Sequence, residues 1–521
     1  MPKTLHLGAI PVFWHFAESS GLIEDFTKAF SSESALKLFS LACLWLQDRD
    51  PDFRNYRKFV TSYAVPHPEP MNNSTVKVFC TGLGRSLDEI AKFFRLRIAR
   101  INPSAIDRFD TPEVIPCDRT FAFNSVLDVP EYENFMVTHL RVLADRSSGM
   151  PLLFNTDLVD EEDTGEVCLD TGMEARFLEP TDILTMPCLP FPSSAELLTC
   201  MNSCEEYNDY ELLTPVEYED PVFHEKLLEI IQAPSGFRDI PGSRYSGCSS
   251  PYTFPLEVSD DGTEAEFSVW LHVFINEDEM AAARSAFLKR LGKFERTCVH
   301  RGKYFGDDGS LIFFDDDDSE TGVERNEEMV NEELQLCGAR ILFSTCELAT
   351  EEVFALDQRA RENFRCFTSG MSGVVDVHPL LRNDAEGRER AFRDGRHLIA
   401  FAAMTIRAAI EQKLRTDRTT GEEPEKSIPG GSAPFSFQDL TELTRDVTAS
   451  QEEAGGSWQI TGSSDRVREL CQALDLDEDF YDCAPGYMMI MEDYAATGQG
   501  SASAGGQGKT GSRKKSGSRK K

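Results

Sequence analysis

The feature that most constrains the fold is a pair of apolar segments separated by a short polar turn. MVTHLRVLAD at 136–145 and MPLLFNT at 150–156 are rich in β-branched and large apolar residues, and DRSSG at 145–149 is typical of a turn. An earlier segment, EVIPCDRTFAF at 113–123, predicts a strand before this pair. We therefore expect an antiparallel meander, which excludes an all-helical fold.

Helical patterns flank this meander on both sides. Apolar residues recur every three or four positions at 21–30, 34–46 and 86–101, which predicts a helical N-terminal region. Further along the chain, strands are expected at 183–189 and 338–345, and helices at 194–201, about 350–367 and 395–414. Strands followed by helices indicate an α+β fold.

The domain organisation follows from changes in composition. The strand pattern EFSVWLHVFI at 266–275 precedes a long amphipathic helix, and we interpret this region as an insertion that splits a core domain. The Gly/Ser-rich stretch from Thr497 onward holds seven basic and no acidic residues, which indicates a disordered basic tail. The expected parts are a helical region at 1–105, a core at 106–219 and 336–416, an insertion at 220–335, a linker and helical appendage at 417–496, and the tail at 497–521.

The charge of the chain argues against nucleic-acid binding unless basic groups are segregated. Asp and Glu number 89 against 53 Lys and Arg, giving a formal charge of −36. Within the predicted insertion helix the balance reverses, and the candidates for phosphate contact are Arg284, Lys289, Arg290, Lys293 and Arg296. An ordinary basic helix end that compensates acidic neighbours explains the same residues equally well. The basic tail is a second candidate, as a tethered polycation.

Several classes of protein lack their signature in this sequence. The first residues show no secretory signal, and apolar runs such as 398–406 are far shorter than the ~20 residues of a membrane span, so we expect a cytoplasmic protein without a membrane partner. The 14 cysteines are scattered and predict reduced thiols rather than zinc ligands. No nucleotide loop, dinucleotide fingerprint or nucleophile elbow is present.

The acidic segment at 313–328 partly matches the ligand spacing of a calcium-binding loop. Its residues Asp317, Ser319, Thr321, Gly322 and Glu328 have suitable spacing. The incoming segment GSLIFF is typical of a strand rather than a helix, so a solvated acidic loop is the preferred interpretation.

Two acidic residues remain as candidates for a catalytic or metal-binding role. Asp118 interrupts a run of strand-forming residues, and Glu362 lies on the predicted helix at 350–367. Carboxylates that converge across a sheet can hold two Mg²⁺ ions for in-line phosphoryl transfer, a site that requires about three such groups.

The order of these segments resembles the DDE transposases of bacterial insertion sequences. The resemblance is carried by GLIEDFTKAF, by IPCDRTFAFNS, by LRVLADRSSGMPLLFNTDLVDE with its Gly-x-Pro-Leu turn, by GARILFSTCELATEEVF, and by the closing segment HPLLRNDAEGRERAFRDGRHLIAFAAMTIRAAIEQKL. It implies an RNase H-like mixed sheet interrupted by a β-rich insertion. It also implies Mg²⁺-dependent DNA cleavage and joining in transposition, with transposon ends as substrate. The sequence leaves open whether the chain acts as a monomer or as a homodimer.

Compared with the family residue by residue, this sequence lacks some of the expected active-site residues. Asp118, followed by Thr120, corresponds to the first catalytic and metal-binding aspartate, and Glu362 with Arg359 corresponds to the catalytic helix, which here lacks the family's tyrosine and lysine. Pro187 stands where the second aspartate is expected, and proline cannot bind magnesium. The sequence therefore predicts weakened or lost catalysis. The alternatives are a non-catalytic DNA-binding or scaffolding protein and an acidic protein-interaction module.

Overall fold

The computed structural model describes most of the chain and divides it into two compact units. Unit 1 comprises residues 1–93 and 390–521, and unit 2 comprises residues 94–389. The chain passes between them within α6 (Leu87–Ile101) and within α13 (Ala385–Thr419). The described residues are 3–47, 53–116, 135–159, 182–187, 211–216, 221–241, 243–257, 264–301, 313–316, 323–368, 385–419, 435–453 and 456–489.

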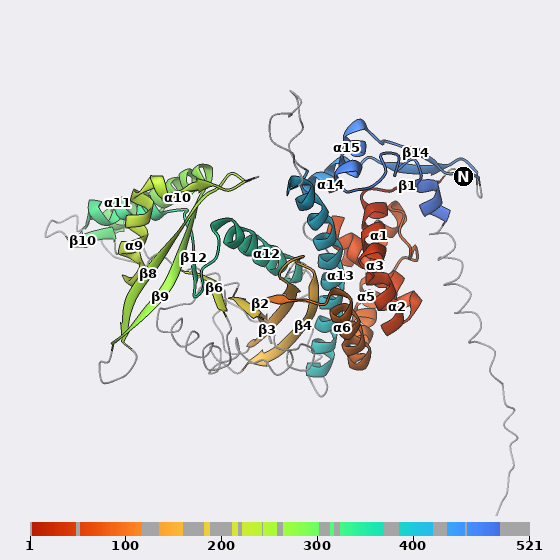
Figure 1. Cartoon of the computed structure of the whole chain (residues 1–521), viewed down its shortest axis with the longest axis horizontal. Helices are drawn as coiled ribbons and strands as arrows, with labels where there is room; N and C mark the ends of the chain where they lie inside the picture. The colour runs from red at the N-terminus through yellow and green to blue at the C-terminus, as the bar shows by residue number, and fades with distance from the viewer. Residues whose placement is uncertain are drawn as a thin grey trace, which may run out of the picture. The chain divides into compact units, whose positions relative to one another are not determined.

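Unit 1 is a helical assembly with a small antiparallel sheet (Figure 1). The sheet has the order β1-β13-β14, formed by Lys3–His6, Thr448–Gln451 and Gln459–Thr461. The N-terminal region is helical, as predicted. Its helices are α1 (Ile10–Ser19), α2 (Leu22–Ala29), α3 (Ser32–Gln47), α4 (Tyr56–Ser62) and α5 (Asn73–Arg85), and the C-terminal part adds α14 (Phe437–Leu443) and α15 (Asp465–Ala473).

Within unit 1, two buried tyrosines near the C-terminal end of the described residues donate hydrogen bonds to backbone carbonyls of the N-terminal region. The hydroxyl of Tyr481 donates to the carbonyl of Gly8 at 2.8 Å, and that of Tyr487 donates to the carbonyl of Ala64 at 3.2 Å. Both carbonyls lie in loops, where the backbone has no helical partner of its own. The segment at 477–489 is therefore part of the core of unit 1 rather than a separate appendage.

Helices α5 and α13 approach each other closely at two glycines. A Cβ atom on Gly84 would lie 1.8 Å from the carbonyl oxygen of Ala391, and one on Gly395 would lie 1.9 Å from that of Cys80. Only glycine leaves room for the opposing backbone at these two positions. The crossing gives Gly84 and Gly395 a structural role.

Unit 2 is built on a nine-stranded mixed sheet with the order β4-β3-β2-β5-β6-β12-β9-β8-β7. The strand β2 pairs antiparallel with β3, which pairs antiparallel with β4, while β5 and β6 run parallel to β2. From β6 onward all neighbours are antiparallel. The strands are β2 (Ala105–Pro116), β3 (Phe135–Asp145), β4 (Pro151–Val159), β5 (Asp182–Pro187), β6 (Glu211–Pro215), β7 (Arg238–Asp239), β8 (Ser246–Glu257), β9 (Glu264–Ile275) and β12 (Arg340–Ser344).

The region predicted as an insertion continues the sheet of the core. After β6 the chain leaves through α9 (Pro221–Gln232), builds β7, β8 and β9, and passes through α10 (Glu277–Arg301) and α11 (Glu327–Leu336) before β12 returns between β6 and β9. One face of these strands packs under α9 and α11 through a core that includes Leu227, Leu271 and Phe343. Figure 1 shows the three helices beside the long strands β8 and β9.

The sequence predictions hold best where local pattern is strong. The strands predicted at 136–145 and 150–156 are confirmed as β3 and β4, and the helix at 350–367 is confirmed as α12 (Thr350–Thr368). The strand expected at 113–123 begins earlier, at Ala105, because β2 pairs along its whole length with β3. The expected helix at 194–201 and the tail at 497–521 lie outside the described residues.

The glycine crossing gives a first test. Replacing Gly395 with alanine places a methyl group against the Cys80 carbonyl, so we expect a loss of about 3 kcal/mol in the free energy of unfolding. Gly82, on α5 but facing open space, is the matched control, and Gly82→Ala should stabilise by about 1 kcal/mol through helix propensity. Urea unfolding followed by tryptophan fluorescence measures both. Equal effects of the two substitutions would contradict the crossing.

Candidate functional site

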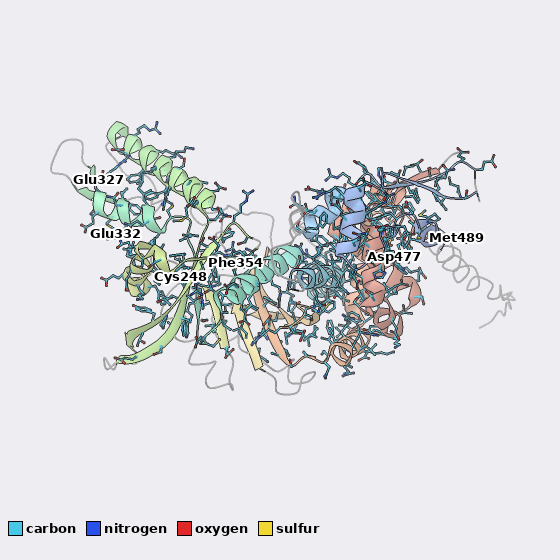
Figure 2. All side chains as sticks on the ribbon, turned by 45° about the horizontal axis from the view of Figure 1, so that its top comes forward. Cys248, Glu327, Glu332, Phe354, Asp477 and Met489 are labelled. Carbon is cyan, nitrogen blue, oxygen red and sulfur yellow. The ribbon has the colours of Figure 1, made fainter. Side chains whose placement is uncertain are left out.

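Helix α12 crosses one face of the nine-stranded sheet and brings the predicted catalytic helix close to β2. Its residues Val353, Leu356 and Ala360 are buried at helical spacing, and Phe354 stacks near Phe274 of β9 with ring centroids 5.3 Å apart. Figure 2 labels Phe354 toward the end of α12 nearest β8 and β9. The opposite end of the helix therefore lies toward β2 and β3.

A buried carboxylate on β2 receives two arginines at this end. The side chain of Asp107 is fully buried, and its Oδ1 accepts from Nε of Arg146 at 3.0 Å while its Oδ2 accepts from Nη1 of Arg359 at 2.8 Å. Nη1 of Arg359 also donates to the carbonyl of Arg146 at 3.3 Å. The three residues link β2, the turn after β3, and α12. We call them the Asp107 cluster.

The turn predicted at 145–149 positions this cluster. Asp145 accepts hydrogen bonds from the hydroxyl of Ser147 and from both the amide and the hydroxyl of Ser148, at 2.6 to 2.8 Å. Gly149 has φ of +72°, and a Cβ there would lie 3.0 Å from Nε of Arg359. Glycine thus both permits the turn and leaves space for the guanidinium group.

The electrostatics of Asp107 combine two opposing effects. Burial raises the pKa of its carboxyl because the charged form loses water, and the guanidinium groups of Arg359 and Arg146 oppose that rise. Two hydrogen-bonded cations are what a buried carboxylate needs to remain in the interior. The oxygens of Asp107 are therefore engaged by arginine and are poorly suited to a metal ion.

The predicted catalytic residues are only partly described. Glu362 lies on α12, one turn after Arg359, but its side chain is outside the described part of the structure. Asp118 lies outside the described residues. Both assignments stay predictions.

The strand register instead places a different aspartate beside Pro187. In the parallel pairing of β2 with β5, Asp110 is the partner of Pro187, the last residue of β5. From Asp110, β2 runs on for six residues to Pro116, about 20 Å of extended chain. Asp110 is thus the acidic residue whose backbone is paired with Pro187 in the sheet.

Sequence reasoning missed Asp107, Arg146 and Asp110. The available signal was the segment AIDRFD at 105–110, in which three charged residues stand beside Ile and Phe inside a strand. Charged residues that share a strand with large apolar residues indicate a buried charged group that needs a partner.

The five basic residues predicted on the insertion helix have different roles. Arg284 is half-buried, and its Nε donates to the carbonyl of Leu334 at 2.7 Å, which joins α10 to α11. Glu295, the acidic residue among them, is paired with Arg325 at 2.7 Å. Four basic residues remain exposed on α10 and form what we call the α10 basic face: Lys289, Arg290, Lys293 and Arg296.

The acidic segment at 313–328 has an antiparallel strand pair at its described ends. The strands β10 (Phe314–Asp316) and β11 (Val323–Arg325) pair with each other, and residues 317–322 are outside the described part. A strand pair rather than two helices flanks the segment, in keeping with the preferred interpretation of an acidic loop.

Comparison with known proteins gives no assignment. A scan against models of protein families and a search among curated protein sequences find no match. Among the described residues, no group of three or more His, Cys, Asp or Glu side chains could hold a metal ion. The described helices include none with the length and apolar character needed to cross a bilayer.

The Asp107 cluster provides the second test. Asp107→Asn leaves two arginines beside a neutral amide in the interior, so we expect a loss of about 3–5 kcal/mol in the free energy of unfolding. The control is Asp475→Asn, which breaks an exposed ion pair with Lys413 and should leave the free energy of unfolding nearly unchanged, because solvent screens that pair. Chemical denaturation compares the two variants. A small effect at Asp107 would show that the cluster does not hold α12 on the sheet.

Proposed function

We propose that this protein is a transposase-like protein with an RNase H-like core whose DNA cleavage and joining activity is weakened or lost. The observation that carries the proposal is the order of β4, β3, β2, β5 and β6. An RNase H-like core has a five-stranded mixed sheet. Its first three strands along the chain form an antiparallel meander, and the next two run parallel to the first of them. The strands β2, β3 and β4, followed by β5 and β6, fit that order. The region interpreted as an insertion precedes α12 and α13, which fits a family whose core is interrupted by a β-rich insertion.

The loss of activity is argued from the metal chemistry. Two Mg²⁺ ions acting on a phosphodiester need several carboxylate oxygens at fixed positions. Asp110 faces Pro187 in the register, where a second carboxylate is expected, and Asp107 is bound by two arginines. The described residues therefore do not fit a pair of magnesium ions.

A gain-of-function substitution tests this proposal. Purified wild-type protein should leave supercoiled plasmid intact in Mg²⁺ or Mn²⁺, and should bind Mn²⁺ weakly by calorimetry. Pro187→Asp places a carboxylate beside Asp110, and we expect Mn²⁺ affinity to rise by about tenfold or more, the effect of one added ligand worth about 1.4 kcal/mol.

Three further variants separate the outcomes. Asp110→Asn in the Pro187→Asp background should abolish the gained affinity, whereas Asp118→Asn should abolish it only if Asp118 is the first carboxylate. Pro187→Ala controls for the loss of the proline ring. Plasmid nicking by the wild-type protein that disappears in Asp118→Asn or Glu362→Gln would overturn the proposed loss of activity.

The second candidate is a DNA-binding or scaffolding protein without catalysis. It is favoured by the α10 basic face, which gathers four exposed cations on one helix of a strongly acidic chain. Lysine and arginine on an exposed helix contact phosphates regardless of base sequence.

Neutralising this face tests the second candidate. The triple substitution of Lys289, Lys293 and Arg296 by glutamine should weaken binding to duplex DNA at salt above 0.1 M and reduce the slope of log K against log salt by about 2–3, because each lost phosphate contact contributes about 0.9. The matched control replaces Arg54, Arg57 and Lys58, which are exposed around α4, by glutamine. Fluorescence anisotropy measures both. Absence of binding at any salt would favour an acidic protein-interaction module.

A further inference from the structure

A buried histidine lies between α12 and the strands beneath it. His272 on β9 is fully buried and makes one hydrogen bond from each ring nitrogen. Its Nδ1 is 2.7 Å from the hydroxyl of Ser249 on β8, and its Nε2 is 2.9 Å from the hydroxyl of Ser344 on β12. Ser249 in turn lies 2.8 Å from the hydroxyl of Thr350, the first residue of α12.

The direction of each hydrogen bond in this chain can be deduced. The hydroxyl of Ser344 donates its one proton to the carbonyl of Cys346 at 2.6 Å, so it can only accept from His272. His272 therefore carries its proton on Nε2, and Nδ1 must accept from Ser249. Since Ser249 has used its proton, Thr350 donates to Ser249.

The same contacts hold the first turn of α12 against the sheet. Gly247 on β8 lies under this turn, and a Cβ on it would come 2.7 Å from the methyl carbon of Thr350. Thr350 and Ser249 are half-buried, so the hydrogen-bonded chain leads from the buried histidine to side chains that solvent partly reaches. A proton from solvent reaches Nδ1 most directly where that turn lifts.

We propose that the chain from Thr350 through Ser249 and His272 to Ser344 is a proton-sensitive latch, closed while His272 is neutral and released at the first turn of α12 when Nδ1 gains a proton. A charged imidazolium in this position would reverse the Ser249 hydroxyl and lie unhydrated in the sheet. If the first turn of α12 lifts from the sheet, water reaches the charged imidazolium of His272, and the structure lost is that one helical turn. Global unfolding is the costlier route.

The charged and titratable groups around His272 do not offset its charge. Arg340 on β12 is paired with Asp357 of α12, and the carboxylates nearest the start of the helix are exposed. Burial lowers the pKa of His272 to about 4. The titratable and charged groups described on the surrounding elements include Cys248 and Tyr252 on β8, Glu266 on β9, Arg340 on β12, Cys346 and Glu347 in the loop after it, and Glu351, Glu352, Asp357, Arg359 and Arg361 on α12.

The pH dependence of the latch follows by linkage. With the turn open, His272 regains an ordinary pKa near 6.5, whereas with the turn closed it titrates near 4. The closed turn is therefore fully stable above about pH 6.5 and is weakened as the pH falls toward 4, by about tenfold in the opening equilibrium per pH unit.

Hydrogen exchange of the full-length protein tests the proposal. After correction for intrinsic rates, amides at 350–356 should lose protection between pH 6.5 and pH 4 by about tenfold per pH unit, while amides of β9 and β12 remain protected. His272→Gln removes the titration and should abolish this loss. His224→Gln, on the surface of unit 2 beside Glu332, is the control and should behave as wild type.

The tautomer is measured on the unaltered chain by ¹⁵N-histidine NMR. A ring protonated on Nε2 at neutral pH is expected, and a ring protonated on Nδ1, or one that titrates near 6.5, would overturn the deduced proton order. If His272→Gln does not fold, Ser249→Ala breaks the link to Thr350 and should increase exchange at 350–356 already at pH 7. Simultaneous loss of protection in α12, β9 and β12 would show global unfolding and disprove the latch.

Discussion

The ion pairs of Asp107 are the interaction on which the arrangement of unit 2 depends. A carboxylate with no exposure to solvent is costly unless cations replace its water, and here two guanidinium groups do so. Arg146 is supplied by the turn between β3 and β4, and Arg359 by a helix residue that lies 252 positions after Asp107 in the chain. The pairs can form only when both elements are in place, so the position of α12 on β2 is coupled to the completion of the sheet, including the strands contributed by the insertion.

The elements that could be predicted from sequence are those whose signal is local. The turn residues of DRSSG fixed the ends of β3 and β4, because Asp145 and Gly149 act within five residues of each other. The helical period predicted α12 within one residue at its C-terminal end. By contrast, β8 contains serines and prolines and carries no clear strand pattern, and its twelve residues are extended because they pair along their full length with β9.

The candidate site was harder to predict from the sequence because it depends on which residues of β2 and β5 are paired in the sheet. Asp118, the charged residue within the strand expected at 113–123, lies outside the described residues and stays a prediction, whereas the parallel pairing of β2 with β5 brings the backbone of Asp110 beside Pro187. Nothing in the local sequence specifies this register, since it is set by the six residue pairs that β2 makes with β5, a strand more than 60 residues further along the chain. The partners of Asp107 are equally non-local. The assignment of Pro187 to the position of the second aspartate rests on the family resemblance and stays a prediction, although proline itself cannot bind a metal ion wherever it stands.

The α10 basic face must act within the field of a chain whose formal charge is −36. The Debye length is about 8 Å at physiological ionic strength, so distant acidic groups are largely screened there, and Glu295 is already paired with Arg325. The acidic first turn of α10, Glu277 to Glu279, lies ten or more residues before Lys289, about 15 Å along the helix axis. Near physiological salt the four cations therefore act as a local patch, whereas at low salt the rest of the protein repels an approaching polyanion. Both the proposed attraction to phosphate and the repulsion from the body weaken as salt rises, but the repulsion weakens at lower salt because it acts over longer distances.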